Sequence, residues 1–317
     1  MRRSSPWKAE LVRAMAPGKL MLTGSYVVLE GAPALVVAVD RYAIADSRVA
    51  DARPSSEIRL AFGDGPAPRV DVRSLCDATG RKLGLGSSAA GLVAALGARA
   101  LLRGVDPTEP SVREDLFRSA RSAHARAQGG GSGVDVAAST YGGVLHYCTR
   151  GDADGSVRRL AWPESLVLVA YDCGVSARTS DLLASVLSHR ARGEGSGVCT
   201  KLRDAAERAL VAFEARDVQG FIDWARIFGR GLEDLGRGAD VPIVLPRVAE
   251  LASLAAEEAA AFLPSGAGGG DVAVWMSLAE PSREFSRRAT TLSMHRVPLS
   301  IDRGGVRPAL PDPLKES

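Results

Sequence analysis

The sequence predicts a mixed α+β protein in which strands gather in the first half of the chain and helices in the second. Apolar segments rich in β-branched residues, such as 34–44, indicate buried strands in the first half. Segments with helical character, such as 200–216, dominate the second half. The polar stretch 150–156 separates the two patterns. We therefore expect one domain over residues 1–155 and a second over residues 156–317.

Composition narrows the class of protein. The chain has 317 residues and a hydrophobic content of 46%, enough for two modest domains with real cores. Lys and Arg (40) nearly balance Asp and Glu (37), so no basic field predicts a nucleic-acid partner. The basic start leads into no apolar segment, and no stretch approaches the length of a membrane span. We expect a cytoplasmic protein with no membrane partner, either a monomer or a homodimer.

The four cysteines lie far apart in the sequence and form no C-x-x-C pair. This spacing argues against a zinc site and against a disulfide framework.

The first half is expected to form a sheet made partly of hairpins. Residues 9–16 alternate loosely between apolar and polar, and Pro17-Gly18 is expected to break that strand. A turn at 30–33 separates two further apolar runs. The expected strands cover 9–16, 20–29, 34–44, 58–62 and 142–149, and the expected helices cover 89–100 and 114–128 and begin again near Val134.

The second half is expected to pack helices around a few buried strands. Apolar runs predict strands at 165–171, 272–278 and 297–301. Helical patterns occupy 179–188, 200–216, 218–235, 245–262 and 281–294.

A glycine-rich stretch, K-L-G-L-G-S-S-A-A-G over residues 82–91, is the strongest candidate for an anion site. Gly84 and Gly86 permit backbone conformations that a β-carbon would forbid, and Ser87 and Ser88 offer hydroxyls. A helix that opens directly behind the loop presents free amides and a positive dipole end. The Gly-Lys-Ser/Thr ending of a Walker A loop is missing. Taken alone, the stretch could equally be a turn that caps a helix.

Three other stretches accompany this loop in the chain. Pro17-Gly18-Lys19-Leu20 follows the first strand, and the glycine-rich run 129–133 leads into a helix near Asp135. The run 266–270 leads into the buried strand at 272–278. In isolation, Lys19 would be interpreted as a solvated surface lysine and Asp135 as a helix N-cap.

In combination and in this order, the stretches resemble the GHMP kinase superfamily. The resemblance rests on A-P-G-K-L-M-L-T-G-S-Y-V-V-L-E-G, G-L-G-S-S-A-A and S-G-A-G-G-G-D, and covers nearly the whole chain. Ala123-His124, the run 131–138 and Tyr141-Gly142 look most like the phosphomevalonate kinase branch, with mevalonate kinases next. The resemblance implies a two-domain α+β fold with the active site in the cleft between the domains.

The resemblance also implies site residues, with ATP as co-substrate and Mg²⁺ as metal. Lys19 and Asp135 would be catalytic, and Ser88, or its neighbour Ser87, would help to hold the metal. His124 stands where mevalonate kinases carry a metal-binding carboxylate, and we interpret it as structural because imidazole is a poor ligand for Mg²⁺. The nucleotide would lie against Gly84, Leu85, Gly86, Ser87, Ser88 and Ala89. The small-molecule substrate would contact Lys82, Ser132, Gly133, Arg178, Thr179, Gly268 and Gly269.

The nature of the acceptor decides which of these residues matters most. A phosphate monoester has a second pKa of about 6, so it needs no general base at neutral pH. We therefore expect Lys19 to outweigh Asp135, with Lys82, Arg178 or Arg41 facing the acceptor phosphate. The predicted reaction converts 5-phosphomevalonate to 5-diphosphomevalonate. A mevalonate kinase, a diphosphomevalonate decarboxylase and a catalytically silent ligand sensor are the alternatives.

Two departures from the family pattern bear on these alternatives. Gly24-Ser25-Tyr26 lacks the usual carboxylate of the first motif, and the region between Phe62 and Lys82 is short. Both features are what a silent sensor could show.

Overall fold

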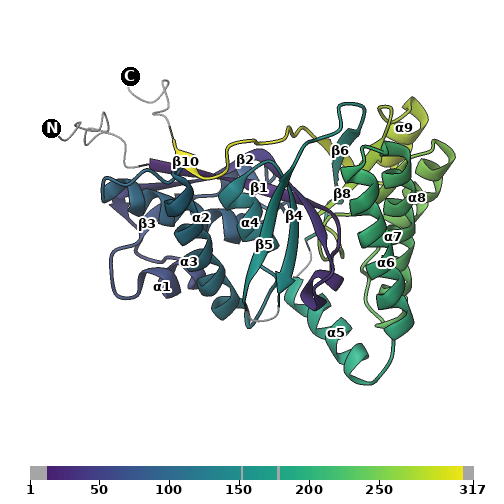
Figure 1. The fold of residues 1–317 in the computed structure, drawn as a ribbon. Coiled ribbons are helices and arrows are strands. Elements are labelled where there is room, and N and C mark those ends of the chain that lie inside the picture. The colour runs from purple at the N-terminus through teal and green to yellow at the C-terminus, as the bar shows by residue number, and fades with distance from the viewer. Residues whose placement is uncertain (1–12, 151–152, 177–178, 310–317) are drawn as a thin grey trace.

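The computed structural model describes residues 13–150, 153–176 and 179–309, which form two sheets with helices packed against them (Figure 1). A six-stranded sheet has the order β10-β1-β2-β4-β5, with β3 also paired to β2. A four-stranded sheet has the order β7-β8-β6-β9. The predicted α+β class in two domains is confirmed.

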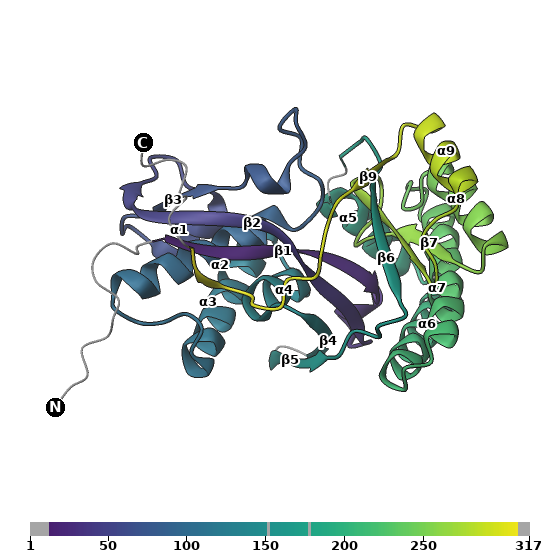
Figure 2. The same cartoon turned by 90° about the horizontal axis from the view of Figure 1, so that it is seen from above.

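The first sheet carries its helices on one face, where α2 packs against β1 and β2 (Figures 1 and 2). The small and apolar residues of α2 are buried along most of its length, which lets the helix lie close to the strands. The elements are β1 (Arg13–Thr23), η1 (Val27–Glu30), β2 (Ala34–Ala50), α1 (Ser56–Phe62), β3 (Pro68–Asp71), η2 (Arg73–Leu75), α2 (Ser87–Leu102), α3 (Pro110–Gln128), α4 (Val134–Tyr141), β4 (Val144–Arg150) and β5 (Ala153–Leu160).

The second sheet is buried on both faces, which explains the continuous apolar run of β8. Val272, Val274 and Met276 face the core that contains α6 and α7, whereas Ala273 and Trp275 face a second core with α8 and α9. The elements are β6 (Val167–Asp172), α5 (Thr179–Ala191), α6 (Ser196–Glu214), α7 (Val218–Gly238), α8 (Pro246–Glu257), β7 (Ala261–Pro264), β8 (Val272–Ser277), α9 (Arg283–Thr291), β9 (His295–Val297) and β10 (Arg307–Pro308).

Strand β1 does not break at Pro17-Gly18, contrary to the sequence prediction. The strand continues to Thr23 with an irregularity in its pairing to β2 between Pro17 and Gly18. The amide of Lys19 then donates to the carbonyl of Leu85 at 2.9 Å. The strand therefore delivers Lys19 to the glycine-rich loop.

Several other expectations about elements were wrong. The strand predicted over 20–29 ends at Thr23 and is followed by η1, and the strand predicted over 297–301 lies instead at His295–Val297. Residues 58–62 lie in helix α1 rather than a strand, since Ser55 caps the helix by accepting from the amide of Ile58. The polar stretch 150–156 contains the start of β5, and the helix expected over 245–262 ends at Glu257 before β7. β5 belongs to the first sheet and runs across residues 155 and 156, where we placed the domain boundary.

The end of the described chain returns to the first sheet. Figure 2 shows residues after β9 crossing back over the molecule, and β10 pairs antiparallel with β1. The two domains are thus joined by more than one crossing of the chain. Within the described residues, no helix is both long and apolar enough to cross a membrane.

Candidate active site

A cavity of about 610 Å³ opens between the two domains. Its walls come from β1, from the segments before α2 and α4, and from the loop between β7 and β8, so segments far apart in the sequence meet here. The residues that line it and that we discuss below are Lys19, Lys82, Gly84, Gly86, Ser87, Ser88, His124, Gln128, Ser132, Gly133, Asp135, Ser176, Gly266, Ala267 and Asp271.

The loop Gly84–Ser88, which we call the phosphate loop, runs directly into helix α2. Gly86 is the N-cap residue in the left-handed conformation (φ +76°), and the helix begins at Ser87. The first amides of a helix have no acceptor within it, so they are available to an anion. The side chains of Leu85 and Ala89 are buried in the core. These two residues can therefore meet a nucleotide only through their backbone.

Lys19 is a buried lysine on the cavity wall. Only 9% of the residue is exposed, and its Nζ donates to the carbonyl of Gly84 at 3.1 Å. Burial lowers the pKa of Lys19, while the negative charges of Asp135 and Asp271 act in the opposite direction. Its ammonium group is thus poised between two carboxylates and the phosphate loop.

Asp135 lies in the first turn of α4, opposite Lys19 across Gly86. A β-carbon added to Gly86 would lie 3.2 Å from Cγ of Lys19 and 3.6 Å from Cβ of Asp135. One carboxylate oxygen accepts from the amide of Val136 at 2.9 Å. The other lies 3.6 Å from Nε2 of His124, which is itself 3.0 Å from Nε2 of Gln128. The Asp135 side chain is 24% exposed and faces the cavity.

Ser88 is paired with a carboxylate that the sequence did not point to. Its Oγ donates to Oε1 of Glu57 on α1, which leaves the oxygen lone pairs of Ser88 free to meet a cation. Burial raises the pKa of Glu57, but hydrogen bonds, first that from Ser88 and then those from its own amide, Ser55 and Ser56, outweigh this and lower the pKa to about 2. Glu57 is therefore ionised at neutral pH.

The oxygen of Ser88 beside the phosphate loop fits the preferences of Mg²⁺. This ion prefers oxygen ligands, keeps several waters and takes phosphate oxygens readily. Ser88 supplies an oxygen at the cavity wall, next to the amides that would hold phosphates. Among the described residues, no group of three or more His, Cys, Asp or Glu side chains gathers as a metal site.

Sequence reasoning missed Glu57 because residues 58–62 were interpreted as a strand, which left the carboxylate without a helix to place it. A signal was present. Ser55 followed by an acidic residue in the first turn is a helix-start pattern.

The predicted substrate residues divide into three groups. Lys82, Ser132 and Gly133 line the cavity. Thr179 begins helix α5, and Arg178 lies outside the described residues.

Gly268 and Gly269 are not among the residues that line the cavity, and their contact with substrate stays a prediction. The amide of Gly269 donates to the carbonyl of Ile243 at 2.9 Å, and Gly268 packs against the same carbonyl. The cavity wall is formed instead by Gly266, Ala267 and Asp271.

Arg41 is also placed away from the cavity. Its guanidinium donates to the carbonyl of Ser74 at 3.2 Å, and the residue is not part of the cavity wall.

Known proteins share sequence with most of this chain. Residues 63–143 match the model of the GHMP kinases N terminal domain. Phosphomevalonate kinase of Streptomyces sp. (strain CL190) is 30% identical over 90% of this chain and 96% of its own length. The chain belongs to the GHMP kinase family. This GHMP kinase is therefore a phosphotransferase.

One further relative and one solved structure are similar to this chain. Mevalonate kinase of Aeropyrum pernix is 31% identical over 65% of this chain and 72% of its own length. The structure of Streptococcus pneumoniae phosphomevalonate kinase in complex with phosphomevalonate and AMPPNP superimposes with a TM-score of 0.76. That alignment covers 91% of this chain and 99% of the other at 18% identity, so it supports the fold.

Proposed function

We propose that this GHMP kinase transfers the γ-phosphoryl group of ATP to 5-phosphomevalonate, giving 5-diphosphomevalonate and ADP. The observation that carries the proposal is the buried ammonium of Lys19, held between the phosphate loop, Asp135 and Asp271. The similarity to a phosphomevalonate kinase over nearly the full length of both chains supports this choice of acceptor. The product would be an intermediate of isoprenoid precursor synthesis by the mevalonate pathway.

The donor side of the site is assembled by the phosphate loop. Free amides at the start of α2 and the dipole of that helix would bind the nucleotide phosphates. Ser88, oriented by Glu57, would hold Mg²⁺ together with phosphate oxygens, and the ion supplies neutralisation of the phosphate charge. Lys19, whose Nζ donates to the carbonyl of Gly84, would neutralise charge that develops during the transfer.

The transfer itself requires little covalent chemistry from the protein. A phosphate oxygen of the acceptor forms a bond to the γ-phosphorus, while the bond between that phosphorus and the β–γ bridging oxygen breaks. ADP leaves with the electron pair of the broken bond. Because the acceptor is already anionic near neutral pH, the main barrier is bringing two anions together, and Lys19 and Lys82 on the cavity wall offset it.

Mevalonate kinase activity is the second candidate, and Asp135 favours it. A hydroxyl acceptor must lose a proton, and Asp135 is a partly exposed carboxylate beside Lys19 that could accept it. The similarity to an archaeal mevalonate kinase supports the same alternative.

One assay separates these candidates. ADP release is coupled to a dehydrogenase reaction and measured with mevalonate, 5-phosphomevalonate, 5-diphosphomevalonate, homoserine and galactose in turn. We expect the highest kcat/KM with 5-phosphomevalonate. A preference for mevalonate would replace the proposal by its alternative, and ATP binding without turnover of any acceptor would indicate a silent sensor.

The role of Glu57 beside the metal is tested by Glu57→Gln. We expect a loss of Mg²⁺-dependent nucleotide affinity of about tenfold, because an uncharged amide orients Ser88 less firmly. Calorimetric titration of a non-hydrolysable ATP analogue with and without Mg²⁺ measures it. Equal loss under both conditions would mean that Glu57 supports the loop and not the metal. The exposed Glu233→Gln on α7 is the matched control.

A further inference from the structure

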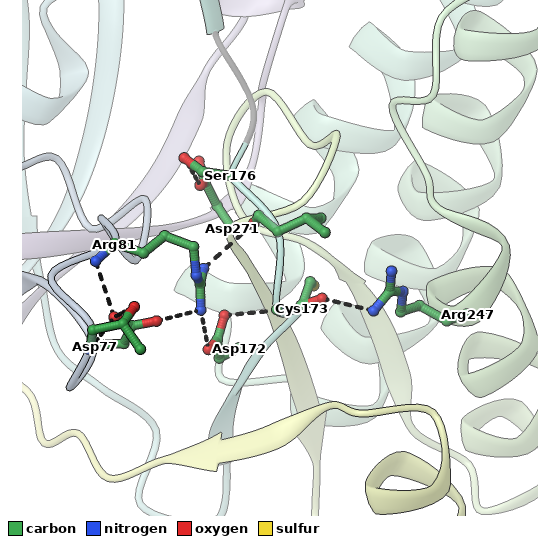
Figure 3. Close-up of polar contacts among 10 residues, drawn as sticks. Asp77, Arg81, Asp172, Cys173, Ser176, Arg247 and Asp271 are labelled. Atoms are coloured by element: carbon green, nitrogen blue, oxygen red, sulfur yellow. Dashed lines mark hydrogen bonds and ion pairs between the residues drawn. The ribbon is translucent and has the colours of Figure 1, made fainter.

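A segment of the second domain, residues 173–176, is held against the cavity by a set of polar contacts (Figure 3). The amide of Cys173 donates to the carbonyl of Asp271, and the amide of Asp271 donates to the carbonyl of Val175, both at 2.7 Å. The Ser176 hydroxyl donates to the Asp271 carboxylate at 3.3 Å. Since Ser176 and Asp271 both line the cavity, these bonds shape its wall.

Arg81 reaches this segment from the first domain. Its guanidinium donates to Oδ2 of Asp172 at 2.5 Å and makes a longer contact of 3.5 Å with the carbonyl of Val175. Within its own domain it pairs with Asp77 at 2.9 Å. A planar guanidinium with several donors can hold both carboxylates at once, as Figure 3 shows.

Asp172 links Arg81 to the backbone of the segment. Its second oxygen, Oδ1, accepts from the amide of Gly174 at 2.9 Å, so one carboxylate binds Arg81 and fixes the backbone that follows β6. The side chains of Arg81 and Asp172 are only 23% and 14% exposed, and partial burial strengthens such a pair relative to one in water.

These contacts connect residues 173–176 with the phosphate loop on one side of the cavity. Arg81 is followed by Lys82, Leu83 and then Gly84 of the phosphate loop, and Gly84 packs directly against the side chain of Asp271. The segment 173–176 is therefore linked to the first domain in two ways: directly through Arg81, and indirectly through Asp271, which packs against Gly84. Loosening either contact would let the segment move relative to the phosphate loop.

We propose that Arg81 is a positioning residue that holds residues 173–176 against the phosphate loop and so assembles the acceptor side of the cavity. The role toward the acceptor rests on the function proposed above, whereas the role of Arg81 in holding residues 173–176 does not. It assigns Arg81 no contact with substrate. Its effect should therefore fall on the KM for the acceptor more than on kcat.

The reactivity of Cys173 measures the mobility of the segment without any substrate, and Cys199 serves as the control. Cys173 lies in it and is 1% exposed, and burial raises the pKa of its thiol to about 12. Cys199 on α6, which lies outside the segment, is also a free thiol and is buried. In Arg81→Ala we expect alkylation of Cys173 by iodoacetamide at pH 8 to accelerate about tenfold, with Cys199 unchanged. An unchanged rate at Cys173, or equal acceleration at both cysteines, would overturn the proposal.

Two further variants test whether the contact between Arg81 and Asp172 is itself responsible for the change at Cys173. Arg73→Ala removes an exposed pair with Asp71 at 2.5 Å in the same domain, and we expect no change at Cys173. Asp172→Asn keeps an acceptor for Gly174 but loses the charge that Arg81 binds. We expect the double variant Arg81→Ala/Asp172→Asn to match Arg81→Ala alone, and additive effects on alkylation would contradict a shared contact.

Activity then tests the second half of the proposal. With 5-phosphomevalonate we expect KM for the acceptor to rise about tenfold in Arg81→Ala, with nucleotide KM and kcat within about twofold. If alkylation changes but acceptor KM does not, Arg81 holds the segment without positioning the acceptor, and the proposal fails. If wild-type protein turns over no 5-phosphomevalonate, the proposed function fails while the alkylation result stands.

Discussion

Two carboxylates in the cavity, Asp135 and Asp271, act on Lys19, and the protein holds them in different ways. Asp135 projects from the first turn of α4 and is held by its own helix, through the amide of Val136. Asp271 has a left-handed backbone (φ +51°) and is held by the segment 173–176 through backbone and side-chain bonds. Both act electrostatically on Lys19. Asp135 is thus held by its own helix and faces the cavity, whereas Asp271 is bonded to the segment that lies between the domains.

The largest effect is expected at the cation between the two carboxylates. Lys19→Met should lower kcat/KM with 5-phosphomevalonate by about 10²- to 10³-fold, because a preorganised charge beside the transferring group is lost. The ADP-release assay measures it, with the exposed Lys201→Met on α6 as control. A loss smaller than about tenfold would show that the two carboxylates do not share a catalytically important cation.

Next in size is a change that tests the structural role of Asp271. Gly84→Ala should cost about 2–4 kcal/mol of unfolding free energy in urea, since a β-carbon would lie 2.5 Å from Cγ of Asp271 at φ +71°. Adding Asp271→Gly should recover the steric part and leave about 1 kcal/mol of backbone strain. If the double variant is as unstable as the single one, contact with Asp271 is not the cause.

A matched glycine isolates the strain. Gly104 has φ +74° and no atom within 4 Å of an added β-carbon. Gly104→Ala should therefore cost only about 1 kcal/mol.

The smallest effect is expected at Asp135. With 5-phosphomevalonate, Asp135→Asn should lower kcat less than about tenfold, because this acceptor needs no general base, whereas general-base catalysis is worth about 10²- to 10⁴-fold. Steady-state kinetics of Asp135→Asn and Lys19→Met, measured side by side, show which substitution causes the larger loss of activity. A loss at Asp135 that exceeds the loss at Lys19 would reverse it and favour a hydroxyl acceptor.

Local patterns accounted for much of the fold. The helical segments at 89–100, 114–128 and 218–235 are helices in the structure, because their apolar spacing and small residues act over single turns. The strand at 58–62 and the break at Pro17-Gly18 were wrong, since a capping serine and a tolerated bulge depend on neighbours that the pattern ignores.

The sequence alone determined the three glycine-rich runs, their order and the residues Lys19, Ser88 and Asp135 within them. Their arrangement around one cavity, the pairing of Ser88 with Glu57 and the bridge from Arg81 to Asp172 were decided only by the tertiary structure. Glycine-rich runs are local features, so the sequence reveals them. The pair separated by 31 residues depends on how α1 packs beside α2, and the pair separated by 91 residues depends on how the two domains pack. No short-range pattern encodes either packing.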